Sequence, residues 1–275
     1  MNNQIPLDNF TNNTQDHIRN LLDFFKRTKE EQDARFAFLK QIEPQSRLAA
    51  VLVLLFEQDG RLRVLLTTRG KDLKVHGGQT SLPGGKIDEE DKGDIIATAY
   101  REAHEEVNLP RQSSQIHTLG ILDLQPFHKL VVTPVVAILT DNAILDHLKH
   151  NEGEVDKIFS YPLEGFLDPA LSAQTDELVE KGSKDWPYPE DYHHFWDPVI
   201  DALGGTSYRY HHFRSSASPI TGFTADALIR AAEITFNRSP TYERFAHDQV
   251  RNFDEIFTAF EEHRKKEAGK ADRQQ

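Results

Sequence analysis

The spacing of hydrophobic residues changes along the chain and predicts a mixed α/β fold. Between Thr14 and Leu39, apolar residues recur with helical spacing around a charged middle. Two apolar runs, Leu48–Phe56 and Leu62–Thr67, flank a turn at residues 58–60, which is typical of a β-hairpin. The first run has nine residues, whereas a bilayer span needs about 20. We therefore expect it to be a buried strand.

A helix is predicted in the middle of the chain, after a glycine-rich stretch at 76–86 that is too punctuated for regular structure. Asp94 is a suitable N-cap, and Asn108 can close the helix in the left-handed conformation before Pro110. The apolar face of this helix is expected to carry Ile95, Ile96, Ala99, Ala103 and Val107.

The second half of the chain predicts further strands and two more helices. Strand-like runs lie at 116–122, 130–139 and 157–160, and helical patterns at 224–236 and about 242–260. Residues 168–207 are polar, aromatic and turn-rich, and we interpret them as an insertion. The expected organisation is an N-terminal helical extension (1–43), one α/β domain (44–240) and a C-terminal helix with a charged tail (241–275).

Composition excludes several classes of protein. The chain has 44 acidic and 32 basic residues, a net charge of −12, which argues against sequence-independent binding of nucleic acid. It has no cysteine, which removes disulfides, thiolate zinc sites and cysteine nucleophiles. No secretory signal is visible at the start. We therefore expect a soluble intracellular protein with no membrane partner, and peroxisome, mitochondrion and cytosol remain open.

The sharpest chemical feature is a cluster of acids in the predicted central helix. Glu102, Glu105 and Glu106 are spaced i, i+3 and i+4, so their Cβ atoms lie about 5–6 Å apart on one face. Two carboxylates 4 Å apart repel by about 4 kcal/mol at an effective dielectric constant near 20. A hard divalent cation such as Mg²⁺ would offset this repulsion. The competing interpretation is a solvated acidic face, but the adjoining alanines place the carboxylates beside the buried edge.

Just before this helix, the charged residues change from mostly basic (a positive strip at 61–86) to mostly acidic (88–106). Residues 88–106 hold eight acids and two bases, and Gly84 and Gly85 precede them with backbone amides that an anion can approach closely. A positive strip followed by a negative cluster suits a phosphate ligand whose oxygens meet the bases and, through metal ions, the carboxylates. Residues 61–86 hold one acid and six bases, Arg61, Arg63, Arg69, Lys71, Lys74 and Lys86.

This stretch resembles a Nudix box, in which Gly and, after five residues, Glu precede the run Arg-Glu-apolar-x-Glu-Glu-x-Gly-apolar. Asp91 stands where the pattern has Glu, the gap to the Arg is two residues longer, and Asn108 replaces the closing Gly. The matching residues are Gly85, Arg101, Glu102, Ala103, Glu105, Glu106 and Leu109.

A narrower resemblance points to the coenzyme A diphosphatases within that superfamily. The run Leu65-Leu-Thr-Thr-Arg69 and the later Leu82-Pro-Gly-Gly85 are similar to their signature, although Lys74 stands for Arg, Leu82 for Phe and Gly70 for Ser or Ala. His76-Gly-Gly-Gln79 is similar to their HxGQ motif. The resemblance implies substrate contacts from Arg69, Lys74, His76, Gln79, Gly84 and Gly85.

The resemblance implies a Nudix-type α/β/α sandwich with a mixed sheet and a dependence on Mg²⁺ or Mn²⁺. The implied reaction cleaves the pyrophosphate of coenzyme A or its thioesters to 3′,5′-ADP and (acyl-)4′-phosphopantetheine. Glu102 and Glu106 would bind the metal, Glu105 would be a third ligand or the base, and Arg101 would hold a carboxylate in place. Glu154 is a candidate for an extra ligand or base.

Two other functions remain open at this stage. One is hydrolysis of other nucleoside diphosphate derivatives or of oxidised nucleotides such as 8-oxo-dGTP. The other is a non-catalytic sensor of nucleotides or coenzyme A, motivated by the lengthened loop at 91–94. A homodimer is compatible with the sequence. The pairs His193-His194 and His211-His212 are interpreted as packing or surface residues rather than as a metal site.

Overall fold

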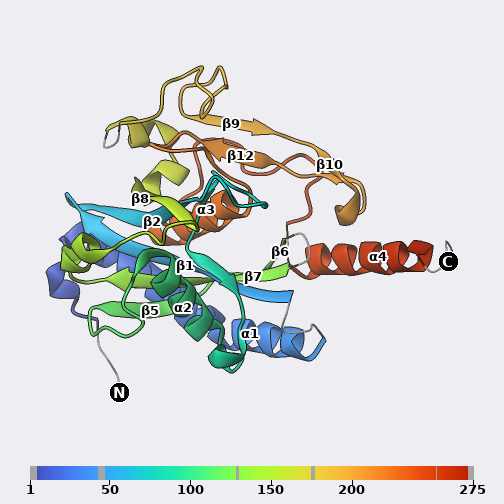
Figure 1. The fold of residues 1–275 in the computed structure, drawn as a ribbon, viewed down its shortest axis with the longest axis horizontal. Helices are drawn as coiled ribbons and strands as arrows, with labels where there is room; N and C mark the ends of the chain where they lie inside the picture. The colour runs from blue at the N-terminus through green and yellow to red at the C-terminus, as the bar shows by residue number, and fades with distance from the viewer. Residues whose placement is uncertain (1–4, 43–46, 128–129, 175–176, 252, 272–275) are drawn as a thin grey trace.

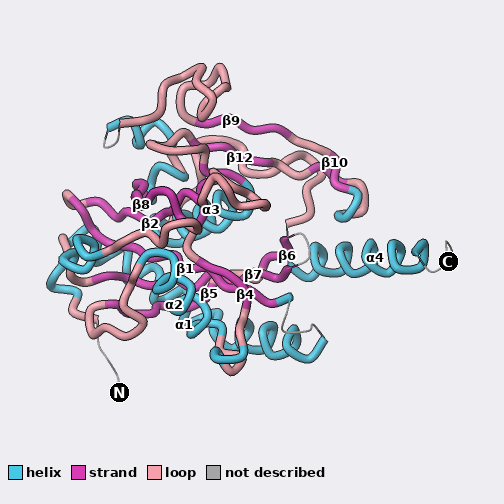
Figure 2. Tube along the Cα trace, in the orientation of Figure 1, coloured by secondary structure: helices cyan, strands magenta, loops and turns pink. Residues whose placement is uncertain are grey.

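A mixed eight-stranded sheet with helices on both faces forms the centre of the molecule (Figures 1 and 2). The computed structural model describes residues 5–42, 47–127, 130–174, 177–251 and 253–271. This architecture confirms the α/β/α sandwich. Among the described helices, none has both the length and the hydrophobicity of a membrane span. The helices are α1 (Asn12–Ile42), α2 (Ile95–Val107), α3 (Gly222–Phe236) and α4 (Phe253–Ala271).

The sheet is arranged around its first and longest strand. β1 runs parallel to β7, and every other pairing in the sheet is antiparallel. The order is β3-β2-β1-β7-β5, with β8 on β2, β4 on β1 and β6 on β7. The strands are β1 (Leu48–Gln58), β2 (Arg61–Arg69), β3 (Thr80–Ser81), β4 (Gly84–Lys86), β5 (Ile116–Ile121), β6 (Gln125–Phe127), β7 (Leu130–Leu139) and β8 (Val155–Pro162).

The predicted hairpin is confirmed, and its turn explains the register of β1 and β2. Gln58 pairs with Arg61, which leaves Asp59 and Gly60 as a two-residue turn with φ values of 53° and 72°. A two-residue hairpin turn of type I′ requires positive φ at both positions, and the Asp-Gly pair tolerates this well.

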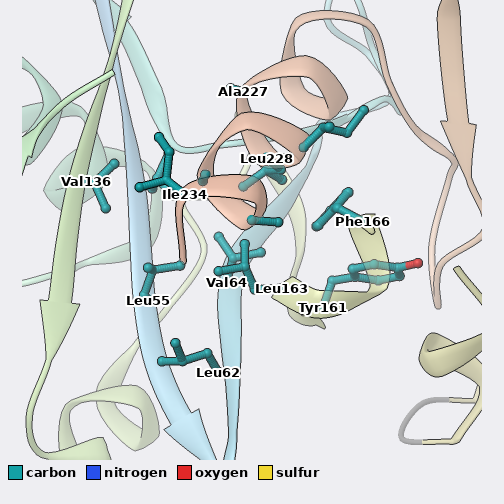
Figure 3. Packing of buried hydrophobic residues seen from close by; sticks show 14 of the residues in the cluster. Leu55, Leu62, Val64, Val136, Tyr161, Leu163, Phe166, Ala227, Leu228 and Ile234 are labelled. Carbon is teal, nitrogen blue, oxygen red and sulfur yellow. The ribbon is translucent and has the colours of Figure 1, made fainter. Parts of the chain in front are cut away.

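Alternate residues of β1 serve two separate hydrophobic clusters, one on each face of the sheet. Val53 and Leu55 face the cluster that includes α3 and the first half of α1, whereas Leu52 and Leu54 face α2. Figure 3 shows Leu228 and Ile234 of α3, Val136 of β7, and Leu55 and Val64 of the hairpin in the first cluster. Fully burying one such side chain contributes about 1.5–3 kcal/mol.

The N-terminal helical segment covers the sheet rather than extending away from it. Ile18, Leu21 and Phe25 of α1 are buried in the cluster with α3. The start of the helix is tied to the end of β1, because the Glu57 carboxylate accepts the Thr11 N–H (3.0 Å) and the Thr14 hydroxyl (2.9 Å).

Two predictions about where regular structure begins and ends were wrong, as was one about a buried residue. Residues 76–86 contain the short strands β3 and β4. A Cβ at Gly84 would lie 2.3 Å from the Ala50 oxygen, so only glycine lets β4 approach β1 this closely. Ile96 is 37% exposed and lies off the apolar face of α2. The last helix begins at Phe253, not near Tyr242, and continues through the charged tail as far as Ala271, projecting from the body (Figure 1).

The segment interpreted as an insertion, 168–207, forms part of a second, small sheet. Its strand β9 (His193–Trp196) pairs with β12 (Tyr210–Phe213), which also pairs with β13 (Ile220–Thr221). Two further short strands, β10 (Val199–Ile200) and β11 (Thr206–Ser207), form a ribbon beside it. His193 Nε2 lies 2.9 Å from His211 Nδ1, and the His211 side chain is buried, as expected for packing histidines.

We expect Glu57→Ala to lower the free energy of unfolding by about 1–2 kcal/mol, the usual cost of losing a helix-capping contact. The variant leaves the Thr11 N–H and the Thr14 hydroxyl without their acceptor at the start of α1. Urea unfolding measures the loss, with Glu30→Ala on the exposed side of α1 as the control. Equal stability of the two variants would show that the Glu57 carboxylate does not anchor the helix.

Candidate active site

Helix α2 positions the predicted acids, and its ends are fixed as the sequence predicts. Asp94 Oδ1 accepts the N–H groups of Ile96 (2.9 Å) and Ala97 (3.3 Å) at the start. At the end, Asn108 has a φ of 58°, and the Leu109 N–H donates to the Ala103 oxygen at 3.3 Å. This is a Schellman-type closure. Both caps fix which face of the helix each glutamate occupies.

The three glutamates differ sharply in burial, although they share one side of the helix. Ala99 and Ala103 are fully buried against the sheet, and the glutamates lie at the border of this contact. The Glu105 side chain is 41% exposed and that of Glu102 18%, whereas Glu106 as a residue is 7% exposed. The competing interpretation, a wholly solvated acidic face, therefore does not hold for Glu106.

Arg101 joins this cluster through all five N–H groups of its guanidinium. Nη1 donates to Glu102 Oε1 (2.9 Å) and Glu105 Oε2 (3.0 Å). Nη2 donates to the Lys86 oxygen (2.8 Å) and Asp91 Oδ2 (3.0 Å), and Nε donates to Asp91 Oδ1 (3.0 Å). Guanidinium has exactly this number of donors. Hydrogen bonding to Asp91 raises the pKa of Arg101 further, against the effect of burial.

Asp91 is the carboxylate that anchors Arg101 from behind. Its side chain is 2% exposed, and besides Arg101 it accepts the Asp88 N–H (2.8 Å) and the Thr98 hydroxyl (2.9 Å). Burial acts to raise the pKa of Asp91, but hydrogen bonds from these partners together lower it. The lengthened loop therefore still brings an acid to the arginine.

Glu105 is held on the exposed side by two arginines. Its Oε2 pairs with Arg101, and its Oε1 lies 3.1 Å from Arg111 Nη2. Arg111 also pairs with Glu90 at 3.4 Å. The sequence reasoning missed Arg111; the available signal was its position just after the end of the helix, six residues beyond Glu105.

Glu106 lies on the inner side, beside β4 and the end of β2. Its Oε2 accepts the Gly84 N–H at 3.3 Å. Burial, followed by the charge of Glu102, raises the pKa of Glu106 to about 8, against the effects of Arg69 and of the Gly84 N–H. The charge of Glu154 acts in the same direction as that of Glu102. Burial also raises the pKa of Glu102, although Arg101 opposes this. The surroundings of these two neighbouring carboxylates thus compensate their negative charge only in part.

Gly85 brings the backbone of β4 directly against the glutamates. A Cβ at this position would lie 2.4 Å from both Cδ and Oε1 of Glu102. Gly85 pairs with Ala50 of β1, so this close approach is built into the sheet register. Any side chain at Gly85 would displace the Glu102 carboxylate.

The structure brings together only part of the predicted substrate-binding set. The charge of Arg69 lowers the pKa of Glu106, and the Gly84 N–H donates to the Glu106 carboxylate. The backbone of Gly85 lies against the Glu102 carboxylate. Arg69 Nε is buried and has no hydrogen-bond partner within the described residues.

The remaining three predicted residues, Lys74, His76 and Gln79, lie along the turn-rich loop at 70–79 that follows β2. His76 Nδ1 lies 2.9 Å from Gln79 Oε1, so the HxGQ motif closes on itself within this loop. Arg63 does not belong to the exposed basic strip, because its guanidinium is buried and donates to Ser160 Oγ (2.8 Å) and the Ser160 oxygen (3.1 Å).

The chemistry of the donor set suits a hard divalent cation. Glu106 is buried and Glu102 half-buried, their carboxylates repel each other, and a cation would relieve both costs. Glu154 is exposed, and its Oε2 accepts a hydrogen bond from Asn151 Nδ2 at 3.0 Å. Across the described residues, no three His, Asp or Glu side chains are already arranged around one metal position. Arg101, not a metal alone, offsets part of the repulsion that the sequence analysis assigned to a cation.

Comparison with known proteins identifies the family. The family model described as NUDIX domain matches residues 46–181. Nudix hydrolase 15, mitochondrial, from Arabidopsis thaliana is 39% identical over 198 residues, covering 70% of this chain and 60% of that protein. The chain thus spans less than two thirds of this relative's length.

A bacterial relative is covered more fully. The uncharacterized Nudix hydrolase NudL from Klebsiella pneumoniae is 36% identical over 151 residues, which cover 54% of this chain and 72% of that protein. Among solved structures, the Nudix hydrolase RenU from M. smegmatis is 23% identical over 45% of this chain and 74% of that chain, at a TM-score of 0.36, a likeness too slight to carry an argument. The domain match, the sandwich fold and the NudL relative, covered to 72% of its length, agree: the chain belongs to the Nudix family.

Proposed function

We propose that the chain is a metal-dependent diphosphatase that hydrolyses the pyrophosphate bond of coenzyme A or its thioesters. The products would be 3′,5′-ADP and 4′-phosphopantetheine or its acylated form. The observation that carries this proposal is the pair of carboxylates, half-buried Glu102 and buried Glu106, placed between an arginine on one side and the glycine backbone of β4 on the other. The substrate assignment rests on the resemblance of residues 65–85 to the coenzyme A diphosphatase signature.

Glu102 and Glu106 would hold Mg²⁺ or Mn²⁺, with Glu105 or Glu154 as a further ligand or as the base. The bound cation would make a coordinated water more acidic and neutralise charge on the departing phosphate. Both oxygens of Glu105 are engaged by guanidinium groups, which favours a positioning role. Glu154 is exposed and carries a single side-chain hydrogen bond from Asn151, which favours it as an acceptor for the proton of water.

The chain's own residues supply the anion-binding side of the site. The Arg69 guanidinium lies close enough to Glu106 to influence its ionisation, and it would bind a phosphate oxygen of the substrate. Asp91 and Arg101 keep the Glu102 carboxylate in one orientation before substrate arrives, so this part of the site is preorganised. The anchoring of Arg101 by Asp91 also removes the reason for a non-catalytic sensor, because the longer loop leaves the acid–arginine pair intact.

We expect coenzyme A or an acyl-coenzyme A to give the highest kcat/KM in the presence of Mg²⁺ or Mn²⁺, compared with ADP-ribose and 8-oxo-dGTP. Glu106→Gln should lower turnover at least about 100-fold, a loss of about 3 kcal/mol of transition-state stabilisation. Release of 3′,5′-ADP, followed by chromatography, measures the reaction. A preference for 8-oxo-dGTP or ADP-ribose would overturn the substrate, and near-normal turnover of Glu106→Gln would remove Glu106 from the metal site.

We expect Arg69→Ala to raise KM more than it lowers kcat, because the guanidinium binds phosphate in the ground state as well as in the transition state. Steady-state kinetics with coenzyme A tests this. Arg61→Ala is the matched control, since Arg61 is exposed at the opposite end of the same strand. An unchanged KM in Arg69→Ala would show that Arg69, at the end of β2, does not bind the substrate phosphate.

We expect Glu106→Gln to be more stable than the wild type in EDTA, increasingly so as the pH rises. The folded-state pKa of Glu106, about 8, exceeds its ordinary value of 4.5, so ionisation of this group opposes folding. The cost begins above pH 4.5 and is complete above about pH 8. At about 1.4 kcal/mol per pKa unit, it amounts to a few kcal/mol.

Urea unfolding at several pH values, with and without Mn²⁺, measures both effects. Mn²⁺ should stabilise the wild type and leave Glu106→Gln nearly unchanged. A constant stability difference between the two proteins from pH 5 to pH 8 would show that Glu106 ionises freely, and equal stabilisation by Mn²⁺ would place the metal elsewhere.

A further inference from the structure

A cavity of about 810 Å³ opens between α1 and α3, away from the glutamate cluster. Helix α3 and the first half of α1 pack on the sheet face opposite α2. The lining comes entirely from residues outside the segment matched by the NUDIX domain, 46–181. The cavity therefore belongs to the two flanking helices of this chain. It is lined by Asn20, Asp23, Phe24, Lys26, Arg27, Arg230, Glu233, Ile234 and Asn237.

Two braces hold the helices together while leaving the space between them open. At one end, Asn20 Nδ2 donates to the Thr235 oxygen at 3.0 Å. Toward the other end, the Asp123 carboxylate accepts from Gln32 Nε2 (2.9 Å) and lies 3.6 Å from Arg230 Nε. Lining residues recur on each helix at i, i+4 and i+7, as in Asn20, Phe24 and Arg27, so each wall is a single helix face.

The charged rim of the cavity has a positive excess, in a chain whose net charge is −12. Lys26, Arg27 and Arg230 face two acids, Asp23 and Glu233. The Glu233 carboxylate pairs with Arg244 from outside the cavity and lies 3.9 Å from Arg230 Nη1, so Arg230 already lies beside two carboxylates, Glu233 and Asp123. Arg27 Nε donates to a backbone oxygen of its own helix at 3.2 Å, and no ion pair to Lys26 or Arg27 exists within the described residues. These two cations are available to an anion.

The floor of the cavity is apolar. The Phe24 ring is partly buried against the hydrophobic cluster, and Ile234 is 9% exposed. The Arg230 guanidinium lies 5.2 Å from the centroid of the Phe24 ring, so this cation is held at the border between floor and rim. A volume of this size falls in the range of small-molecule sites.

We propose that this cavity binds an amphiphilic anion, with a phosphate or carboxylate head on Lys26 and Arg27 and an apolar part on Phe24 and Ile234. The site is separate from the glutamate cluster and does not depend on the proposed diphosphatase activity. Its position between α1 and α3 would let the ligand bridge the two helices and stabilise their packing.

Isothermal titration calorimetry of the full chain with octyl phosphate, below its micellar concentration and in EDTA, tests the proposal. We expect one molecule bound per chain, and at least tenfold weaker binding in the double variant Lys26→Ala/Arg27→Ala. Both residues are exposed on α1, and alanine preserves helix propensity. Lys29→Ala, an exposed lysine of the same helix outside the cavity, should bind as the wild type does. Arg69→Ala should also retain binding, which separates this site from the glutamate cluster.

Four further ligands test the chemistry. Octanoate should bind, because a carboxylate can replace the phosphate head, whereas neutral octyl glucoside and inorganic phosphate should each bind at least tenfold more weakly than octyl phosphate. The cationic octyltrimethylammonium should not bind. Equal affinity for octyl glucoside would overturn the role of the cations, and equal affinity for inorganic phosphate would overturn that of Phe24 and Ile234. Unchanged binding by Lys26→Ala/Arg27→Ala, or no binding by the wild type, would overturn the site itself.

Discussion

The arrangement of acids in this protein depends on one buried guanidinium. Arg101 uses every donor it has, two toward Asp91, two toward the glutamates of its own helix and one toward the β4 backbone. A lysine has three donors and no fork, so it could not satisfy these directions at once. The guanidinium ties the loop before α2, the helix and β4 into one unit. The acids can therefore lie close together without a compensating ion on each.

The same interaction gives the three glutamates different properties. Glu102 and Glu105 each share Arg101, and Glu105 has Arg111 in addition. Within the described part of the chain, Glu106 has one backbone N–H and the charge of Arg69 to offset its burial. Identical side chains within one turn and a half of helix thus differ in charge compensation because of direction alone. The least compensated carboxylate is the one that faces Gly84 and the end of β2, where an anionic substrate with its cation would lie.

The elements that depend on local chemistry could be predicted from the sequence. The Asp59-Gly60 turn and the caps at Asp94 and Asn108 follow from backbone preferences of the residues themselves. The likeness of residues 85–109 to a known motif indicated the acid cluster. Features set by distant contacts could not be read in this way. Gly84 forms a strand because Ala50 lies behind it, and Arg63 is buried because Ser160 on β8 accepts its donors.

The start of the last helix and the ion-pair partner Arg111 could not be predicted from the sequence, for the same reason. The segment after residue 240 has a helical pattern, yet Tyr242 is held by a hydrogen bond from its hydroxyl to the Phe166 oxygen (2.6 Å) and by ring contacts with His193. The helix therefore begins only at Phe253. Arg111 was missed because it lies outside the motif and meets Glu105 only after the helix has ended and the chain has turned back.

The alternation of one strand separates two chemically different surfaces. Successive residues of β1, such as Leu52 and Val53, support opposite faces, one carrying α2 with its carboxylates and the other carrying α1 and α3 with their cationic rim. A strongly acidic chain repels anions over most of its surface. The two anion sites that we propose, at Arg69 and at the α1–α3 cavity, therefore both depend on local basic side chains. Both faces pack on β1, so a change in packing on either face acts on the strand that also sets the position of Gly85. The register of this single strand therefore places both surfaces relative to each other.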